Sequence, residues 1–299
     1  RSTLFPYTTL FRSICLIILL IFTAICVAPF LLMVAASVTD ENALIAEGYR
    51  FWPSKFSFNC YKYLWLKRET ISRAYLISIF VTVVGTLVNI TITSLFAYPL
   101  ARKDFKWRNT FAFLVFFTML FNGGMTASYI IWTRFFHIKN TIFALLLPNY
   151  LMSGMNILMV RNYYTASIPE AILEAARIDG ASEMKIYTNV ILPLSQPVMI
   201  TIGLFAGIAY WNDWTNGLYY ISNQKLYSIN VYLSNLMNNI QMLSQQSSLT
   251  EGAVLSGMQL PTVGARMAIA MVAMLPLLLI FPFIQGQLIK GVVIGGVKG

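Results

Sequence analysis

Long apolar runs without charge alternate with short polar segments along the whole chain. Six of these runs are long enough to cross a membrane, because a helix needs about 20 apolar residues to span the bilayer core. They are Ile14–Val38, Ala74–Leu100, Asn109–Thr133, Thr141–Val160, Ser195–Tyr220 and Met267–Ile289. The pattern predicts an all-α, polytopic membrane protein with six transmembrane helices.

Some of these runs contain residues that interrupt helices. The third run holds the sequence FNGG, so we expect its helix to end or break at Gly123 and Gly124. Prolines also lie inside several runs. Membrane helices tolerate them where neighbouring helices satisfy the freed carbonyl groups.

One uncharged run, Leu226–Thr250, is too rich in Asn, Gln and Ser to be a span. Its apolar residues recur at helical spacing, which predicts a helical hairpin or an amphipathic helix on the membrane surface. These residues are Ile229, Leu233, Leu236, Met237 and Ile240.

Composition supports a membrane protein and argues against a nucleic-acid-binding one. The chain is 58% hydrophobic and only 11% charged, whereas soluble domains carry about 25% charged residues. Its net charge of +10 comes from 21 Lys and Arg residues that are spread along the chain. Membrane proteins place such residues in loops facing anionic lipid, so we expect membrane lipid as a partner and no nucleic acid.

Six spans put both ends of the chain on one side of the membrane. Lys and Arg divide almost evenly between the two sides, but the short loop Ala101–Arg108 (ARKDFKWR) concentrates them. This density favours a cytoplasmic loop and cytoplasmic termini. Residues 1–13 look like a cloning remnant, so we expect a non-native leader followed by one transmembrane domain over residues 14–299.

The sequence predicts no cofactor or metal bound by this chain and no catalytic residues. Cys15, Cys26 and Cys60 show neither a disulfide framework nor metal-ligand spacing, and His137 is the single histidine. Gly291 and Gly296 have the spacing of a phosphate-binding loop. They lack the Lys-Ser/Thr pair and the following helix that such a loop requires.

Charged residues interrupt the apolar pattern between the fourth and fifth runs, in EAARIDGASEMKIYTNVILP. The sequence predicts a helix-turn-helix over residues 167–193. Ser167 and Glu170 form a capping-box pattern at its start, and Gly180 is suited to a left-handed helix end. We expect helices at Ala171–Ile178 and Ser182–Val190, with a stop at Leu192 and Pro193.

The faces of this unit leave two interpretations open. Small or apolar residues and charged residues occupy different positions, and a short helix pair cannot bury much surface by itself. The unit either packs against its own transmembrane helices or inserts into a partner. The small or apolar residues are Ile172, Ala175, Ala176 and Ala181, and the charged residues are Glu174, Arg177, Asp179 and Glu183.

The stretch resembles the EAA loop of ABC-importer permeases. That family's pattern is E-A-A, three residues, G, about nine residues and then I-x-L-P. The form D-G-A, the tail GVVIGGVKG and the segments FNGG and YWNDW resemble the carbohydrate-uptake branch, in particular the second permease of maltose-type importers and the polysaccharide and lipoprotein-associated permeases. The matching residues are Glu174, Ala175, Ala176, Asp179, Gly180, Ala181, Leu192 and Pro193.

The resemblance implies a type I ABC importer permease in a bacterial plasma membrane. Its EAA loop would act as a coupling helix in a groove of a cytoplasmic ATPase, and the ATPase would use the ATP and Mg²⁺. The family's partners would be a second permease, usually in a heterodimer, two ATPase copies and an extracellular substrate-binding lipoprotein. The outer segments 39–73 and 222–266 would receive that lipoprotein. Within the first of these segments, the tyrosines and tryptophans of Ser57–Trp65 suit contact with the lipoprotein, but they could equally belong to an interfacial helix.

The fifth run ends in YWNDWTNGLYY, whose side chains suit carbohydrate. Aromatic faces bind sugar C–H groups, and amides and carboxylates bind hydroxyl groups. An acid inside a span usually faces a cavity, which applies to Asp213. Aromatic residues also mark the membrane interface, so a belt is the alternative. The expected pathway residues are Trp211, Asn212, Asp213, Trp214, Asn216 and Tyr219, with Asn122 and Asn156 as weaker candidates whose alternative is helix–helix contact.

The sequence is therefore interpreted as a permease that couples ATP hydrolysis by a partner to import of oligosaccharides or polysaccharide fragments. An ion-coupled secondary transporter of a small polar solute is the alternative, and the scarcity of ionisable groups within the spans counts against it. An intramembrane enzyme would need a nucleophile–base pair or a metal site, which the spans do not offer.

Overall fold

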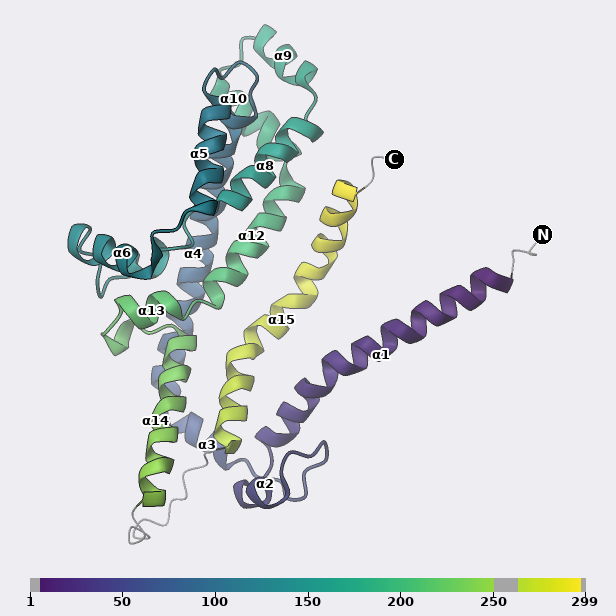
Figure 1. The fold of residues 1–299 in the computed structure, drawn as a ribbon. Coiled ribbons are helices and arrows are strands. Elements are labelled where there is room, and N and C mark those ends of the chain that lie inside the picture. The colour runs from purple at the N-terminus through teal and green to yellow at the C-terminus, as the bar shows by residue number, and fades with distance from the viewer. Residues whose placement is uncertain (1–5, 250–262, 297–299) are drawn as a thin grey trace. The chain divides into compact units, whose positions relative to one another are not determined.

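The computed structural model of the protein describes residues 6–249 and 263–296 (Figure 1). Every regular element in these ranges is a helix, and one isolated bridge joins Thr39 and Phe56. The chain divides into two compact units, formed by the described parts of Arg1–Arg68 with Leu233–Pro276 and of Glu69–Tyr232 with Leu277–Gly299. The predicted all-α class is confirmed.

The first unit joins the beginning of the chain to the beginning of its last helix. It contains α1 (Pro6–Ser37), α2 (Glu41–Glu47), α3 (Asn59–Leu66) and the start of α15 (Val263–Gly296). The carboxylate of Glu41 accepts hydrogen bonds from the backbone N–H groups of Val263 and Gly264, at 2.7 and 2.9 Å. A carboxylate at this position caps the free N–H groups and complements the helix dipole of α15.

Helix α1 covers the first predicted span and begins before it. The apolar stretch Leu10–Ser37 is long and apolar enough to cross a membrane, and its side chains are largely exposed. The helix includes residues 6–13, which the sequence analysis set aside as a leader, while residues 1–5 lie outside the described part.

The second unit is organised along α4 (Arg68–Ala101), a continuous helix that contains the second predicted span. Helices α5 (Arg108–Leu120), α8 (Gly154–Ser167) and α12 (Gln196–Trp211) run beside it (Figure 1). Helix α8 packs against both α5 and α12. Buried side chains of α4, α8 and α12 form one apolar cluster, which includes Ala97, Leu100, Val160 and Ile202.

The predicted break in the third span is present. Helix α5 ends before FNGG, and Gly124 takes a φ of +80°, a left-handed conformation that glycine adopts without strain. The chain then forms α6 (Gly124–Ile130) and the π-helix η1 (Ile131–Phe135). This second segment is bent by 112° from α5.

The fourth apolar run is not one helix, which corrects the prediction of a continuous span over Thr141–Val160. It forms the short helix α7 (Phe143–Leu146), then irregular backbone, and only then α8 from Gly154. Pro148 cannot donate a backbone hydrogen bond, and Asn149 has a φ of +67°. Both features end a helix, and the freed polar groups need partners elsewhere.

The fifth run also divides. Helix α12 ends at Trp211, and the separate helix α13 (Thr215–Tyr220) follows the break at Asn212–Trp214. At its other end α12 is bent by 79° from the preceding helical segment, Glu183–Leu194. The apolar run therefore predicts the helical content of this region, but not its division into two helices.

The polar run after it forms the short 3-10 helix η3 (Gln224–Leu226) and one helix, α14 (Ile229–Leu249), so the hairpin alternative is wrong. The predicted amphipathic spacing is present, because Ile229, Leu233, Leu236 and Ile240 are buried, while Met237 is more exposed. In the described residues, two helices are long and apolar enough to cross a membrane, or up to four if each bent pair forms one span.

Candidate functional site

A helix-turn-helix lies at one end of the second unit, beyond the ends of α4, α5 and α8 (Figure 1). It consists of α9 (Glu170–Ile178) and α10 (Glu183–Ile186), and α10 continues through the π-helix η2 (Tyr187–Ile191) into α11 (Leu192–Leu194). The predicted pair of short helices is confirmed. Backbone conformation determines the turn of this pair, packing determines its inner face, and its outer face is exposed.

The turn is a glycine-based helix end of the Schellman type. Gly180 has a φ of +74°, and the N–H of Ala181 donates to the carbonyl of Ala176 at 3.0 Å. The N–H of Gly180 donates to Arg177 at 2.9 Å, which completes the motif. No atom lies within 4 Å of a Cβ placed on Gly180. Glycine is therefore favoured here by backbone conformation and not by crowding within this chain.

Two details of the predicted boundaries are wrong. Ser167 remains the last residue of α8, and Pro169 precedes α9 without a side-chain cap, so the capping box does not form. The second helix continues past Leu192 and Pro193 and ends at Leu194, with Ser195 as its C-cap. In the π-helix the N–H of Leu192 reaches back to Tyr187, and Pro193 sits in the first turn of α11, where its missing N–H is tolerated.

The inner face of the helix pair packs against its own transmembrane helices. Leu173 and Ile186 are buried, and Ala176 and Ala181 are partly buried against the same apolar cluster that contains Leu100. The hydroxyl of Ser94 on α4 lies 2.7 Å from the phenol oxygens of both Tyr164 and Tyr187. Burial and these hydrogen bonds attach the helix pair firmly to α4 and α8.

The outer face exposes apolar side chains that packing within the chain leaves free. Ile178 is 86% exposed and Met184 is 63% exposed. Glu174, Ala175, Asp179 and Pro193 are exposed as well, whereas Leu192 is half-buried. Ile178 and Met184 were not among the site residues predicted from the sequence. Helical spacing places them opposite the buried Leu173 and Ile186, and this spacing could have identified them.

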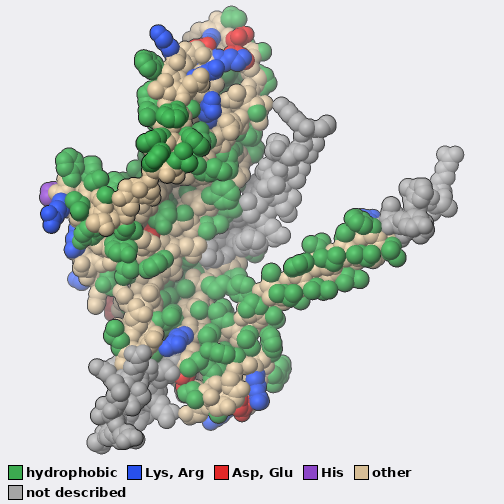
Figure 2. All heavy atoms as spheres, in the orientation of Figure 1, with side chains coloured by type: hydrophobic (Ala, Val, Ile, Leu, Met, Phe, Trp, Pro, Cys, Tyr) green, Lys and Arg blue, Asp and Glu red, His purple; other side chains and the backbone are tan. Residues whose placement is uncertain are grey.

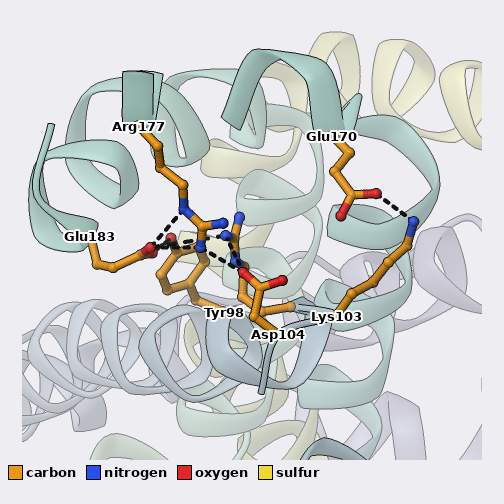
Figure 3. Close-up of polar contacts among 7 residues, drawn as sticks. Tyr98, Lys103, Asp104, Glu170, Arg177 and Glu183 are labelled. Atoms are coloured by element: carbon orange, nitrogen blue, oxygen red, sulfur yellow. Dashed lines mark hydrogen bonds and ion pairs between the residues drawn. The ribbon is translucent and has the colours of Figure 1, made fainter. Parts of the chain in front are cut away.

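Arg177 connects the two helices to the loop that follows α4 (Figure 3). Its Nη2 atom lies 2.8 Å from Glu183 Oε1 and 2.7 Å from Asp104 Oδ2. Arg102, whose side chain is largely buried, reaches the same Asp104 oxygen at 3.1 Å. Tyr98 on α4 donates its hydroxyl hydrogen to Glu183. We call these five residues the loop network.

A second ion pair joins the same loop to the start of α9, between Lys103 and Glu170 (Figure 3). The hydrogen bond from Lys103 to Glu170 raises the pKa of the ammonium group, and the charge of Glu170 acts in the same direction. Acidic and basic side chains gather together at this end of the molecule (Figure 2). The loop Ala101–Arg108 and the helix pair therefore form one polar assembly.

The residues expected to line a substrate pathway fall into two groups. Trp211, Asp213 and Asn216 are buried, as is Asn156. Trp211 stacks on Tyr75, with ring centroids 6.5 Å apart. Asp213 accepts a hydrogen bond from the backbone N–H of Asn216 at 3.1 Å. Trp211, Asp213 and Asn216 therefore have partners within the unit.

The other expected residues are exposed. Trp214 and Tyr219 present large parts of their rings, at 53% and 45% exposure, and Asn212 is exposed beside them. Asn122 is exposed as well, and its side-chain oxygen accepts the N–H of Gly124 in the FNGG turn. Only this exposed group offers side chains that a sugar could contact in the conformation described.

Buried amides satisfy the irregular backbone between α7 and α8. Asn216 donates its amide N–H to the carbonyl of Pro148 at 3.0 Å and accepts from Asn149 at 2.9 Å. Asn89 on α4 donates to the carbonyls of Tyr150 and Leu151, at 2.7 and 3.1 Å. Irregular backbone at membrane depth requires such partners. Asn216 therefore has a structural role that its sequence context did not reveal.

Comparison with known proteins adds relatives that match nearly the whole chain, although no profile of a protein family matches it. The chain is 35% identical over 281 residues to the polygalacturonan/rhamnogalacturonan transport system permease protein YtcP of Bacillus subtilis, covering 94% of this chain and 96% of that protein. It is 23% identical over 289 residues to the melibiose/raffinose/stachyose import permease protein MelC of the same organism, covering 91% of each.

A solved structure has the same fold. One chain of a bacterial ABC transporter involved in the import of the acidic polysaccharide alginate superposes with a TM-score of 0.77. The match covers 96% of this chain and 99% of that chain, at 23% sequence identity.

Proposed function

The chain belongs to the permease subunits of ABC importers for carbohydrate uptake, and from this premise we propose that it carries oligosaccharides or polysaccharide fragments across a bacterial plasma membrane. It is a multi-pass membrane protein that is not itself catalytic. Two relatives carry the names of polysaccharide and oligosaccharide transporters, and the structure with the same fold belongs to an alginate importer. These names support a carbohydrate cargo.

We assign the coupling of ATP hydrolysis to the helix pair α9–α10. The observation that carries this assignment is the contrast between its two faces. The inner face is packed and hydrogen-bonded to α4 and α8, while Ile178 and Met184 project from the outer face. A partner that buries these two side chains can move the helix pair, and the rigid attachment passes the movement to the transmembrane helices.

The partner for this face is the cytoplasmic ATPase of the importer. Its two copies would hold the ATP and Mg²⁺. The exposed Glu174, Ala175, Asp179 and Gly180 would surround the apolar contact, whereas Ala176, Ala181 and Leu192 would support it from within. We infer that the helix pair lies in the cytoplasm and that both chain termini lie there as well. The second permease, usually a different chain, and an extracellular binding lipoprotein complete the complex.

The exposed aromatic group Trp214 and Tyr219, with Asn212, is our candidate for contact with the passing sugar. Aromatic rings pack on the C–H faces of pyranose rings, and the amide can bind hydroxyl groups. The buried Trp211, Asp213, Asn216 and Asn156 would hold this group in position. Asn122 would contribute only if the FNGG turn opens, because its side chain is engaged there.

Isolation of the intact complex tests the proposal. The chain is tagged in its native operon, extracted in mild detergent and analysed for associated proteins and for ATP hydrolysis with candidate glycans. We expect a second permease, an ATPase at about two copies per complex and glycan-stimulated hydrolysis. Recovery of the chain without an ATPase under several mild detergents would contradict the coupling assignment. An associated ATPase that responds to no glycan, but to another solute, would contradict the cargo alone.

A further inference from the structure

The segment Gly124–Asn140, which we call the α6 arm, turns away from the axis of the spanning helix that precedes it. Its helical part is bent by 112° from α5, and Figure 1 shows α6 pointing away from the column formed by α4, α5 and α12. Helix α5 has 13 residues and is therefore about 20 Å long. Because of the bend, the α6 arm cannot extend α5 along the same axis across the bilayer.

The attachment of the arm to α4 gives its depth. Ile138 of the arm is buried in a cluster with Val81, and Tyr129 and Trp132 pack against the same cluster. Val81 lies within α4, and Leu100, near the C-terminal end of α4, lies in the cluster of the helix pair α9–α10. The rise of 1.5 Å per residue in the continuous helix α4 separates Val81 from Leu100 by about 30 Å. This distance equals the thickness of a bilayer core, about 30 Å.

The arm therefore sits at the membrane boundary opposite the coupling helices, and its side chains suit that place. Ile130, Ile131, Phe135 and Phe136 are all exposed, Phe135 to 77%. Arg134 and Lys139 are exposed among them. Apolar and aromatic side chains next to long cationic ones are typical of helices that lie in the headgroup region, where the cations extend toward water.

The cations of the arm differ from those at the coupling end. Arg102, Lys103 and Arg177 all pair with carboxylates there. Arg134 and Lys139 make no ion pair with any residue in the described ranges 6–249 and 263–296, and neither does Lys225 on the adjoining loop. Figure 2 shows basic side chains beside the single histidine, His137, at the tip of the arm.

The loop that carries Lys225 is fixed to the arm. The side-chain oxygen of Asn140 accepts the backbone N–H groups of Ser222 and Asn223, at 2.6 and 3.1 Å. The N–H of Asn140 donates to the carbonyl of Tyr220 at 3.0 Å. These bonds hold Lys139 and Lys225 on adjacent, ordered backbone, so that the cations form a defined surface.

We propose that the α6 arm is an interfacial anchor whose apolar face enters the bilayer and whose cations Arg134, Lys139 and Lys225 bind the anionic headgroups of phospholipids. The 30 Å separation and the bend favour a position at the bilayer boundary, and the positive charge without an ion-pair partner favours anionic headgroups over an apolar protein face. The inference needs α4 to cross the membrane with the helix pair α9–α10 outside the bilayer core. It is independent of the cargo and of the coupling role proposed above.

Depth measurements test the anchor directly. Cys15, Cys26 and Cys60 are replaced by alanine in the full chain, and Phe135→Cys or Ile178→Cys supplies a single site for a spin label. The labelled proteins are reconstituted in vesicles of phosphatidylcholine and phosphatidylglycerol. Ile178 is the matched control, since it is also a highly exposed apolar residue of the same unit, and the proposal places it in water.

We expect oxygen, which dissolves in lipid, to relax the label at position 135 faster than a water-soluble nickel complex does. The order should reverse at position 178. Fast relaxation by nickel at both positions would overturn the anchor, because the arm would lie in water. Slow relaxation by both reagents at position 135 would also overturn it, because protein, for example a second copy of this chain, would then cover the arm.

A second measurement tests the headgroup contact. The fraction of motionally restricted lipid is compared for spin-labelled phosphatidylglycerol and phosphatidylcholine around the full chain. We expect a severalfold preference for phosphatidylglycerol that disappears in Arg134→Gln/Lys139→Gln/Lys225→Gln. The charge-retaining variant Arg134→Lys/Lys139→Arg/Lys225→Arg should keep it. Equal restriction of both lipids around the unmodified chain, or an unchanged preference in the glutamine variant, would overturn the headgroup assignment.

Discussion

Arg177 of α9, in the proposed coupling unit, and Asp104 of the loop after α4 lie 2.7 Å apart, measured from Nη2 to Oδ2. The pair joins two segments that the chain separates by the whole of α5 to α8. Both side chains are partly exposed, so the pair contributes little to overall stability, about 0.2–1 kcal/mol. Its position is more informative, because it connects the coupling helix to a transmembrane helix at a point that the ATPase would move.

Arg177 pairs with two carboxylates, those of Asp104 and Glu183. Asp104→Asn removes the first of these negative charges. We expect the protein level in the membrane to stay normal and uptake to fall by about two- to fivefold, the factor that corresponds to about 0.4–1 kcal/mol. Uptake per ATP hydrolysed is the measurement. Lys106→Gln is the control, since it removes a charge from the same exposed loop outside the network. Normal uptake per ATP hydrolysed in Asp104→Asn would show that the loop network does not transmit movement to α4.

Substitutions at Gly180 can separate backbone strain from loss of docking space. A left-handed φ costs an alanine about 1–2 kcal/mol and asparagine less. We therefore expect Gly180→Asn to keep near-normal uptake and Gly180→Ala to reduce it mildly. Gly180→Trp and Glu174→Lys should abolish coupling while the protein stays in the membrane, because they alter the exposed face. Equal uptake by Gly180→Trp and Gly180→Asn at equal expression would disprove the docking role of this turn.

The turn at Gly180 and the break at FNGG show what the sequence could predict. Both depend on local chemistry, because a left-handed residue is needed at one position and glycine supplies it. The same holds for the spacing of apolar residues in α14. In each case the interactions that decide the structure lie within about one helical turn, so a single stretch of sequence contains them.

The irregular backbone at Pro148–Tyr150 shows what the sequence could not predict. Its carbonyl groups are satisfied by Asn89 and Asn216, which are distant in the chain. Without these partners an unbroken helix is the better solution for an apolar run in a membrane. The Arg177–Asp104 pair was out of reach for the same reason. For the exposed Ile178, the sequence gives the residue type, whereas only the fold gives the direction of its side chain.

Asn216→Ala should destabilise the protein, because it leaves the carbonyl of Pro148 and the amide of Asn149 without their partner. A buried polar group left unsatisfied costs about 1–3 kcal/mol. We expect a lower midpoint of thermal unfolding in detergent. The exposed Trp214→Ala should leave that midpoint unchanged and should lower sugar-stimulated ATP hydrolysis. A stable Asn216→Ala protein with altered sugar response would instead favour a pathway role for Asn216.

Cys60, in the segment before α4, should react slowly with alkylating reagents. Burial and the nearby charge of Glu41 raise the pKa of its thiol from 9.0 to about 11. Since only the thiolate reacts, the rate should rise about tenfold per pH unit up to that value. The neutral thiol's contribution to stability is fully present below pH 9 and is lost as the pH rises toward about 11. A denatured sample is the control. Alkylation at pH 8 as fast as in that sample would contradict the burial.

Ile178→Ser and Met184→Ser test the apolar contact on which the coupling assignment depends. Both side chains are free in this chain, so polar replacements should leave folding and membrane insertion unchanged. Burying one such side chain in an interface contributes about 1.5–3 kcal/mol, which corresponds to a loss of ATPase affinity of roughly 10- to 150-fold. Co-purification of the ATPase measures this loss. Phe135→Ser, on the α6 arm, is the matched control and should retain the ATPase. Equal recovery of the ATPase with all three variants would mean that the coupling helix binds it mainly through polar contacts, and the exposed pair would need another explanation.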